Sequence, residues 1–194
     1  MHNTLKDIQE LHSVVDKILK DSELTQAIDQ VSEMIVEAYR NGNKTIFCGN
    51  GGSSAEAQHL AAELSGKFKM ERAPIPAEAC HVNSSFVTAV GNDYDFTKVY
   101  SRYVEGFGKA GDVLLGLSTS GTSANVVEAF KKAKEKGLKT VALTGQSGGY
   151  LNELSDVILR VPSMNVARVQ EVHLLMGHII CENVERELFD HEIG

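Results

Sequence analysis

From residue 44 onward, short apolar runs alternate with longer segments of helical periodicity, and Gly or Pro residues mark the connections. The runs Val113–Leu117 and Val141–Leu143 are typical of strands buried on both faces of a parallel sheet. We expect strands near 44–48, 76–81, 112–118, 139–144 and 157–161. We expect helices near 53–66, 84–91, 95–108, 122–136 and 165–189. The pattern predicts an α/β fold, a three-layer sandwich around a five-stranded parallel sheet.

Two amphipathic helices precede this region. Apolar residues recur at helical spacing over Leu5–Leu19 and over Leu24–Ala38, and Asn41-Gly42-Asn43 closes the second helix. A sheet covered by its own helices leaves no evident place for this pair, so we expect its apolar stripes to pack against another subunit. The alternative is a simple flank on the sheet. The chain is predicted to be one domain over 1–194, with 1–42 in oligomer packing and 43–194 as the α/β core and C-terminal helix.

Composition excludes several classes of protein. The net charge of −7, from 26 acidic and 19 basic residues, argues against nucleic acid or an anionic membrane as the main partner. The N-terminus lacks the pattern of a secretion signal, and no stretch approaches the roughly 20 apolar residues of a membrane span, so we expect a cytoplasmic protein. Cys48, Cys80 and Cys181 are far apart, which indicates buried apolar residues and not a disulfide framework or a thiolate zinc site.

The segment Cys48-Gly-Asn-Gly-Gly-Ser-Ser54 leads from the first predicted strand of the sheet into a helix. Its glycines let backbone N–H groups approach an anion, and the helix N-terminus adds its positive dipole end and two serine hydroxyls. Phosphate is the anion that such a loop is expected to bind. A purely structural strand-to-helix turn is the alternative, because such turns occur in many α/β proteins.

A second loop, Leu117–Asn125, also ends a buried strand and opens a helix. It concentrates hydroxyl groups at Ser118, Thr119, Ser120, Thr122 and Ser123. One hydroxyl suffices as an N-cap, whereas a phosphate dianion accepts several donors, so a phosphate nest is the better interpretation and a capped turn the alternative. Ligands bind at the carboxyl ends of parallel strands. The two loops therefore predict a phosphorylated small molecule that spans both.

His59 and Glu63 are four residues apart, so on a helix they share one face. This geometry suits a two-ligand metal clip or a cooperating acid–base pair. An ordinary exposed pair has the same spacing.

In combination, these motifs resemble those of the phosphoheptose isomerases, a family of the sugar isomerase (SIS) domain superfamily. The matching segments are Gly49-Asn-Gly-Gly-Ser53, His59-Leu-Ala-Ala-Glu63, Gly91-Asn-Asp-Tyr94, Ser118-Thr-Ser-Gly-Thr-Ser-Ala-Asn125, Leu143-Thr-Gly145 and Arg168-Val-Gln-Glu-Val-His173 with His178. The resemblance covers nearly the whole chain and implies a flavodoxin-like SIS fold and a homotetramer. It implies an aldose–ketose isomerase that converts D-sedoheptulose 7-phosphate to D-glycero-D-manno-heptose 7-phosphate, the first step toward the heptose of lipopolysaccharide or capsule.

The resemblance also implies roles for individual residues. Glu63 and His178 are the implied base and acid of an enediol mechanism. The implied ligands of one zinc ion per subunit are His59, Glu63, Gln170 and His178, of which Gln is an unusual type, and helical spacing alone equally allows Glu171 in place of Gln170. The implied substrate-binding residues are Asn50, Gly51, Gly52, Asn92, Asp93, Ser118, Thr119, Ser120, Ser123 and Gln170. Asn92 and Asp93 also suit a turn or a helix cap.

The segment Cys80-His-Val-Asn-Ser-Ser85 departs from the family pattern, in which a Thr or Ser precedes an acidic or amide residue. Asn83 and Ser84 would fill those places, and His81 is an additional candidate metal ligand. The histidines outside the implied site, His81 included, are interpreted first as structural or solvent-facing: His2, His12, His81, His173 and His191. Two other functions stay open. One is a non-catalytic SIS-type phosphosugar-binding or replication-initiator-associating protein, which should lack the acid–base pair; the other is an isomerase of a different sugar phosphate.

Overall fold

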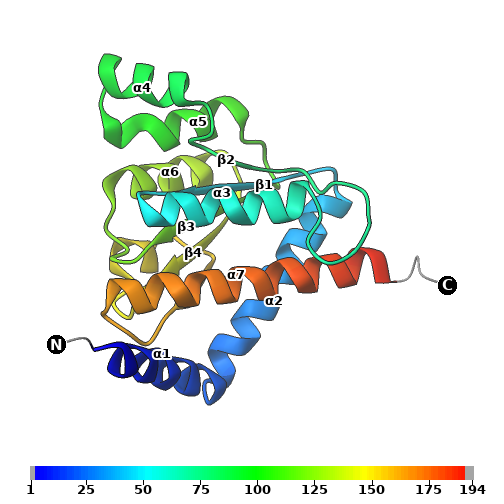
Figure 1. Cartoon of the computed structure of the whole chain (residues 1–194). Coiled ribbons are helices and arrows are strands. Elements are labelled where there is room, and N and C mark those ends of the chain that lie inside the picture. Colours follow the sequence, from blue (N-terminus) through cyan, green and yellow to red (C-terminus); the bar gives the residue numbers. More distant parts are fainter. Residues whose placement is uncertain (1–2, 191–194) are drawn as a thin grey trace.

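Five short strands, all parallel, form the central sheet in the computed structural model, which describes residues 3–190. Their order across the sheet is β2-β1-β3-β4-β5. The strands are β1 Thr45–Gly49, β2 Ala77–Ala79, β3 Val113–Ser118, β4 Lys139–Thr144 and β5 Val157–Arg160. Helices cover both faces of the sheet (Figure 1), which confirms the predicted α/β sandwich.

The helices fall close to their predicted positions. They are α1 Thr4–Leu19, α2 Ser22–Arg40, α3 Gly52–Ser65, α4 Ser84–Asp93, α5 Val99–Phe107, α6 Ala124–Glu135 and α7 Val166–Phe189. The segment predicted as a helix over 95–108 begins instead with a short 3-10 turn, η1 (Phe96–Lys98), because the Asp95 side chain accepts a hydrogen bond from the Thr97 N–H at 2.8 Å. A second 3-10 turn, η2 (Gly149–Asn152), was not predicted. Strand β2 is shorter than predicted because, at the edge of the sheet, it pairs with β1 over only three residues.

Alternate residues of the buried strands face opposite layers of helices. On β3, Val113, Leu115 and Leu117 pack with α2, α3 and α7, whereas Leu114 packs with α4, α5 and α6. On β1, Phe47 belongs to the first of these two cores. The period of two along each strand therefore produces two separate apolar cores, one on each side of the sheet.

Helix α2 packs directly on the sheet, in contrast to the expectation that no place was left for it. Helix α3 packs against β1 and β2 and α7 against β4, so the β5 side of that face is left to α2, which also packs against α7. The residues that α2 buries at helical spacing are Leu24, Ile28, Val31, Ile35 and Val36. Helix α2 therefore flanks the sheet, as the alternative interpretation expected, and packing of its outer surface against another subunit stays a prediction.

Helix α1 lies outside this layer and contacts α2 and α7. It buries only Val14 and Ile18, while Leu5 and Ile8 are 69% and 60% exposed. Packing of this apolar surface against another subunit stays a prediction. Within residues 3–190, none of the helices combines the length and the apolar character needed to cross a bilayer.

Candidate active site

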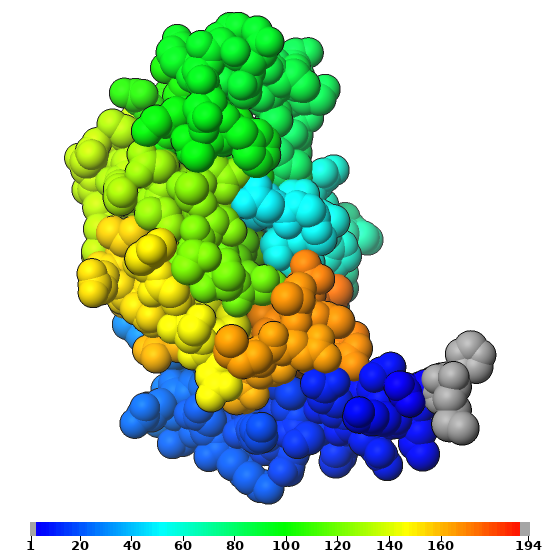
Figure 2. Space-filling model, turned by 90° about the vertical axis from the view of Figure 1, so that its left-hand side faces the viewer, coloured from blue at the N-terminus to red at the C-terminus, as the bar shows by residue number. Residues whose placement is uncertain are grey.

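The two predicted anion-binding loops meet at the edge of the sheet that is formed by the carboxyl ends of the strands. Strand β1 is paired with β2 on one side and β3 on the other, so the loops that follow β1 and β3 flank the point where strand order reverses, the usual ligand crevice of open α/β sheets. Their side chains are joined directly: Asn50 Nδ2 donates to Asn125 Oδ1 and Asn125 Nδ2 donates to Asn50 Oδ1, both at 2.8 Å. Figure 2 looks onto this edge, where the start of α3 (cyan) approaches the yellow-green segment around residue 120 and the start of α7 (orange).

Two residues that hold the first loop were not assigned a role from the sequence. Asn125 is 3% exposed, and Tyr100 on α5 donates its hydroxyl to the Gly49 carbonyl and lies 3.3 Å from Asn50 Oδ1. Asn125 lies inside the serine-rich motif, so its position and its amide side chain could have indicated a role at the site. The sequence around Tyr100 gave no such indication, because no local pattern relates this residue to a loop 50 residues away. Together the two residues fix the Asn50 amide beside the crevice.

The serine-rich loop has the features of an anion site. Ser123 is the N-cap residue of α6 but its hydroxyl makes no capping hydrogen bond; it lies 3.0 Å from the Ser118 hydroxyl instead. Ser120 Oγ accepts from the Thr122 N–H and hydroxyl at 3.2 and 2.9 Å. These hydroxyls cluster at an uncapped helix N-terminus, which favours anion binding over simple capping. Gly121 makes the turn possible: its φ is +67°, and a Cβ there would lie 2.0 Å from the Gly148 carbonyl oxygen.

Gln170 lies at the loop end of the site. A Cβ built on Gly52, the first residue of α3, would stand 2.5 Å from Gln170 Nε2. The glycine therefore leaves the space that the Gln170 amide occupies, and it brings the start of α7 against the start of α3. Gly52 and Gln170, both predicted substrate contacts, are neighbours in the structure.

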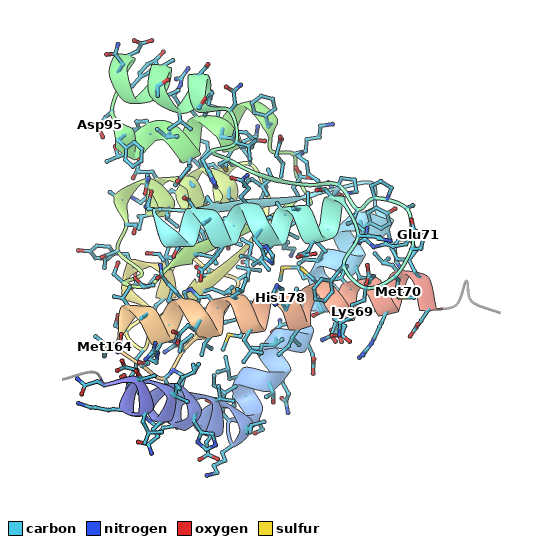
Figure 3. The ribbon with its side chains drawn as sticks, viewed as in Figure 1. Lys69, Met70, Glu71, Asp95, Met164 and His178 are labelled. Atoms are coloured by element: carbon cyan, nitrogen blue, oxygen red, sulfur yellow. The ribbon has the colours of Figure 1, made fainter. Side chains whose placement is uncertain are left out.

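His59, Glu63 and His178 converge between α3 and α7. His59 Nε2 lies 2.8 Å from His178 Nε2 and 3.1 Å from Glu63 Oε1. Figure 3 shows His178 on α7 beside α3. The spacing of His59 and Glu63 on one helix was predictable, whereas their meeting with His178 depends on how the two helices pack. His59 is 45% exposed, and its meeting with His178 goes beyond what the spacing of His59 and Glu63 alone predicted.

The three side chains fit a metal ion. Their ligand atoms all lie within 4.8 Å of one another. Burial, followed by the neighbouring His59, lowers the pKa of His178, so its imidazole is neutral near pH 7. A single hydrogen on His59 Nε2 cannot form good hydrogen bonds to both His178 Nε2 and Glu63 Oε1. One metal cation, in contrast, can be coordinated by all three side chains. Two imidazoles and a carboxylate are ordinary ligands of divalent metals.

The structure separates this triad from the loops. Gln170 precedes His178 by eight residues on α7, which corresponds to about 12 Å along the helix axis. Within one chain, Gln170 therefore stands with Gly52 and not with the three predicted ligands. Asn92 and Asp93 lie exposed at the end of α4, where the Asn92 amide donates to the Asp93 carboxylate at 2.8 Å.

Other titratable groups lie around the site. The ring nitrogens of His173, a fully buried residue, have no hydrogen-bond partner among residues 3–190, and burial lowers its pKa to about 4. His81 is partly buried and His12 is exposed; His2 and His191 lie outside the described residues. Burial raises the pKa of Glu56 to about 7. Glu56 follows Gly52 by one turn of α3 and precedes His59 by three residues, so it lies between the loops and the triad, a position to which the sequence analysis gave no role.

The three cysteines are buried, as predicted. Burial raises the pKa of Cys48 and Cys181 to about 12, so both thiols are protonated at neutral pH. Among the described residues, no cysteine belongs to a candidate metal cluster.

Comparison with known proteins agrees with this geometry. Residues 8–145 match the model of the SIS domain family. The chain is 48% identical over 178 residues to a phosphoheptose isomerase of Clostridium acetobutylicum, covering 92% of this chain and 91% of that protein. The structure of a phosphoheptose isomerase from Neisseria gonorrhoeae superposes with a TM-score of 0.88 at 39% identity, over 94% of this chain and 97% of that one. A phosphoheptose isomerase from Francisella tularensis gives 0.88 at 38% identity, over 96% and 100%. This chain therefore belongs to the phosphoheptose isomerase family of SIS-domain proteins.

Proposed function

We propose that this protein is an aldose–ketose isomerase that converts D-sedoheptulose 7-phosphate to D-glycero-D-manno-heptose 7-phosphate. The observation that carries the proposal is the pair of side chains Glu63 and His178, which converge in a chain that also keeps both anion-binding loops and is 48% identical to a phosphoheptose isomerase. A binding protein that had lost catalysis has no need of this pair. The product would supply heptose for lipopolysaccharide or capsule.

In the proposed mechanism, Glu63 is the base and His178 the acid. Glu63 removes the proton from C1 of the ketose while His178 gives a proton to the C2 carbonyl oxygen, which yields the enediol. Return of a proton to C2 and loss of the proton from the C1 hydroxyl then complete the aldose. The lowered pKa keeps His178 neutral near pH 7, so the proton that it gives to the C2 carbonyl oxygen comes from a ring N–H and is regained from the C1 hydroxyl as the aldose forms.

We assign the phosphate to Ser118, Thr119, Ser120 and Ser123 at the start of α6. Asn50, Gly51, Gly52 and Gln170 would contact the sugar, because they stand at the same crevice. Asn92 and Asp93 are proposed to complete the sugar contacts from the end of α4.

Zinc is the proposed metal, one ion per subunit. His59, Glu63 and His178 would hold it, and bound zinc would supply a Lewis acid that polarises substrate oxygens. Gln170, proposed from family resemblance as the fourth ligand, is about 12 Å away along α7 in the same chain. A Gln170 amide could therefore complete the site only from another subunit or after a large rearrangement.

Distances along α3 support an oligomeric site. Glu63 follows Gly52 by eleven residues and so lies about 16 Å further along the helix. A seven-carbon chain with C–C bonds of about 1.5 Å is only about 8 Å long. A sugar whose phosphate is bound at the serine-rich loop would therefore reach Glu63 and His178 of a second copy. This supports the predicted homotetramer; the cytoplasmic location stays a prediction.

The test is incubation of the purified protein with sedoheptulose 7-phosphate in deuterated water, with and without zinc, followed by NMR and mass spectrometry. Formation of an aldoheptose 7-phosphate with deuterium at C2 is the expected result. Folded protein that gives neither conversion nor exchange in either condition would contradict the proposal. In that case, binding of the sugar phosphate without turnover would favour a phosphosugar-binding protein.

A further inference from the structure

One buried carboxylate on α7 organises the segment that follows α3. Glu185 accepts hydrogen bonds from the backbone N–H groups of Phe68, Lys69 and Met70 at 3.1, 2.8 and 3.0 Å. Its remaining partner is Arg72, whose Nε donates to Oε1 at 2.8 Å. The side chains of Arg72 and Glu185 are each 1% exposed. The backbone of residues 68–70 is therefore fastened to α7 through Glu185, and the exposed Lys69 ammonium adds an ion pair with Glu182 of α7 at 2.6 Å.

Arg72 connects the same carboxylate to the end of α3. Its guanidinium donates to the backbone carbonyls of Glu63 and Leu64 at 2.8 and 2.9 Å. Carbonyl groups in the last turn of a helix have no partner within the helix, so this arginine satisfies groups that would otherwise be orphaned. The ion pair thus joins the end of the helix that carries Glu63 to the helix that carries His178. Figure 3 shows Lys69 and Met70, in the fastened loop, close to His178 along α7.

Phe68 covers one face of the His178 imidazole. The ring centroids are 5.4 Å apart and the ring planes differ by 24°, which is a stacked arrangement. His59 meets the same imidazole edge-on, with centroids 5.1 Å apart and planes at 64°. Rotation of a histidine ring about its last side-chain bond is otherwise broad. Between these two neighbours, the His178 ring keeps the orientation that directs Nε2 toward His59.

We propose that Phe68 is a positioning residue for His178 and that the Glu185–Arg72 pair holds Phe68 in place. Stability alone does not explain a charged pair this deeply buried, because apolar residues of similar volume often stabilise a protein as well or better. Here the carboxylate supplies the acceptor that three backbone N–H groups require. An apolar replacement would leave the loop, and with it the Phe68 ring, without a fixed place. The inference rests on the proposed function only for its readout in turnover.

The first test measures the stacking of Phe68 on His178 without any substrate or metal. Phe68→Leu removes the ring and keeps an apolar side chain, while Phe68→Tyr keeps the ring. In ¹H–¹³C spectra of histidine-labelled protein, the His178 ring resonances, identified by their loss in His178→Gln, should be shifted upfield in the wild type and in Phe68→Tyr. In Phe68→Leu they should move toward the position of free histidine. An unchanged His178 resonance in Phe68→Leu would overturn the inference.

Phe107→Leu is the matched control, because it removes a ring that stacks on Tyr103 at 4.7 Å, away from the candidate site. This variant should leave the His178 resonances unchanged.

The second test measures turnover. Phe68→Leu should lower kcat by about 10- to 100-fold with little change in KM, and Phe68→Tyr should restore it, as expected when a group that orients a reacting side chain is lost. Glu185→Gln should cause a similar loss, because its amide nitrogen cannot accept the loop hydrogen bonds. If Glu185 acts through Phe68, the double variant should lose no more than the worse single one. Additive losses would contradict the part of the proposal that concerns Glu185.

The two proposals can fail separately. A wild-type protein without turnover would contradict the proposed isomerase, and the His178 resonances would then decide the role of Phe68. An active wild type with unchanged kcat in Phe68→Leu would overturn the role of Phe68 and leave the isomerase standing.

Discussion

Gly177 on α7 lies directly against Leu60 on α3, and a Cβ built on Gly177 would stand 2.5 Å from Leu60 Cδ1. The next residue on α7, His178, meets His59, the residue before Leu60, at 2.8 Å between their Nε2 atoms. The missing side chain therefore lets the two helices approach closely enough for the imidazoles to meet. Close packing at one position sets the geometry of the neighbouring candidate metal site.

The change Gly177→Ala should disturb both packing and catalysis. The added methyl group must push Leu60 or α3 aside, and overpacking of this kind costs about 1–3 kcal/mol of unfolding free energy. Separation of the helices should also lower turnover. Chemical denaturation and steady-state kinetics measure the two effects. Gly106→Ala is the control: Gly106 lies within α5 with open space around its Cβ position, so alanine there should stabilise the protein. Equal stability of the two variants would contradict the packing argument.

Replacement of the proposed acid or base should strongly lower turnover without unfolding the protein. Glu63→Gln and His178→Ala should each lower kcat by about 10²- to 10⁴-fold, the usual contribution of general acid–base catalysis. Both side chains lie at the surface between α3 and α7, with Glu63 21% exposed, so the folded state and the oligomer should persist. Stopped assays for the aldose and size-exclusion chromatography provide the measurements. Near-normal rates in either variant would remove it from its assigned role.

The paired amides at the crevice predict an effect on binding. Asn125→Ala removes two partly buried hydrogen bonds to Asn50, each with a net contribution of about 1 kcal/mol to stability. Because Asn50 then loses a fixed position, KM for the sugar phosphate should rise more than kcat falls. Asn125→Asp should raise KM further, since it places a negative charge beside the predicted phosphate site. A KM unchanged in both variants would show that the amide pair does not position the loop.

The elements of this fold were predictable because their signals are local. Continuous apolar runs such as Val113–Leu117 and helical spacing such as that of α7 indicate strands and helices from neighbouring residues alone. The pairing of His59 with Glu63 is local in the same sense, because four residues are one helical turn. The position of α2 on the sheet had no local signal, because it depends on how much of that face α3 and α7 leave uncovered.

The rest of the candidate site depends on contacts between distant segments. Asn50 meets Asn125 across 75 residues, and Phe68 stacks on His178 in a loop whose backbone N–H groups donate to Glu185. No period or spacing encodes such a contact. Family resemblance indicated His178, but it did not indicate Phe68, Tyr100 or the separation of Gln170 from the triad.

The buried His173 predicts a loss of stability in acid. Its folded-state pKa of about 4 lies below the unfolded value of about 6.5. Between pH 4 and pH 6.5 the unfolded chain therefore binds a proton that the folded protein does not bind. Its contribution to stability is complete above pH 6.5 and falls as the pH drops toward 4, by about 3 kcal/mol in total. His173→Phe keeps a buried ring that does not titrate, so its unfolding free energy should fall less over this range. Denaturant unfolding of both proteins between pH 4 and 7 provides the measurement, and curves that run parallel would contradict the assignment to His173.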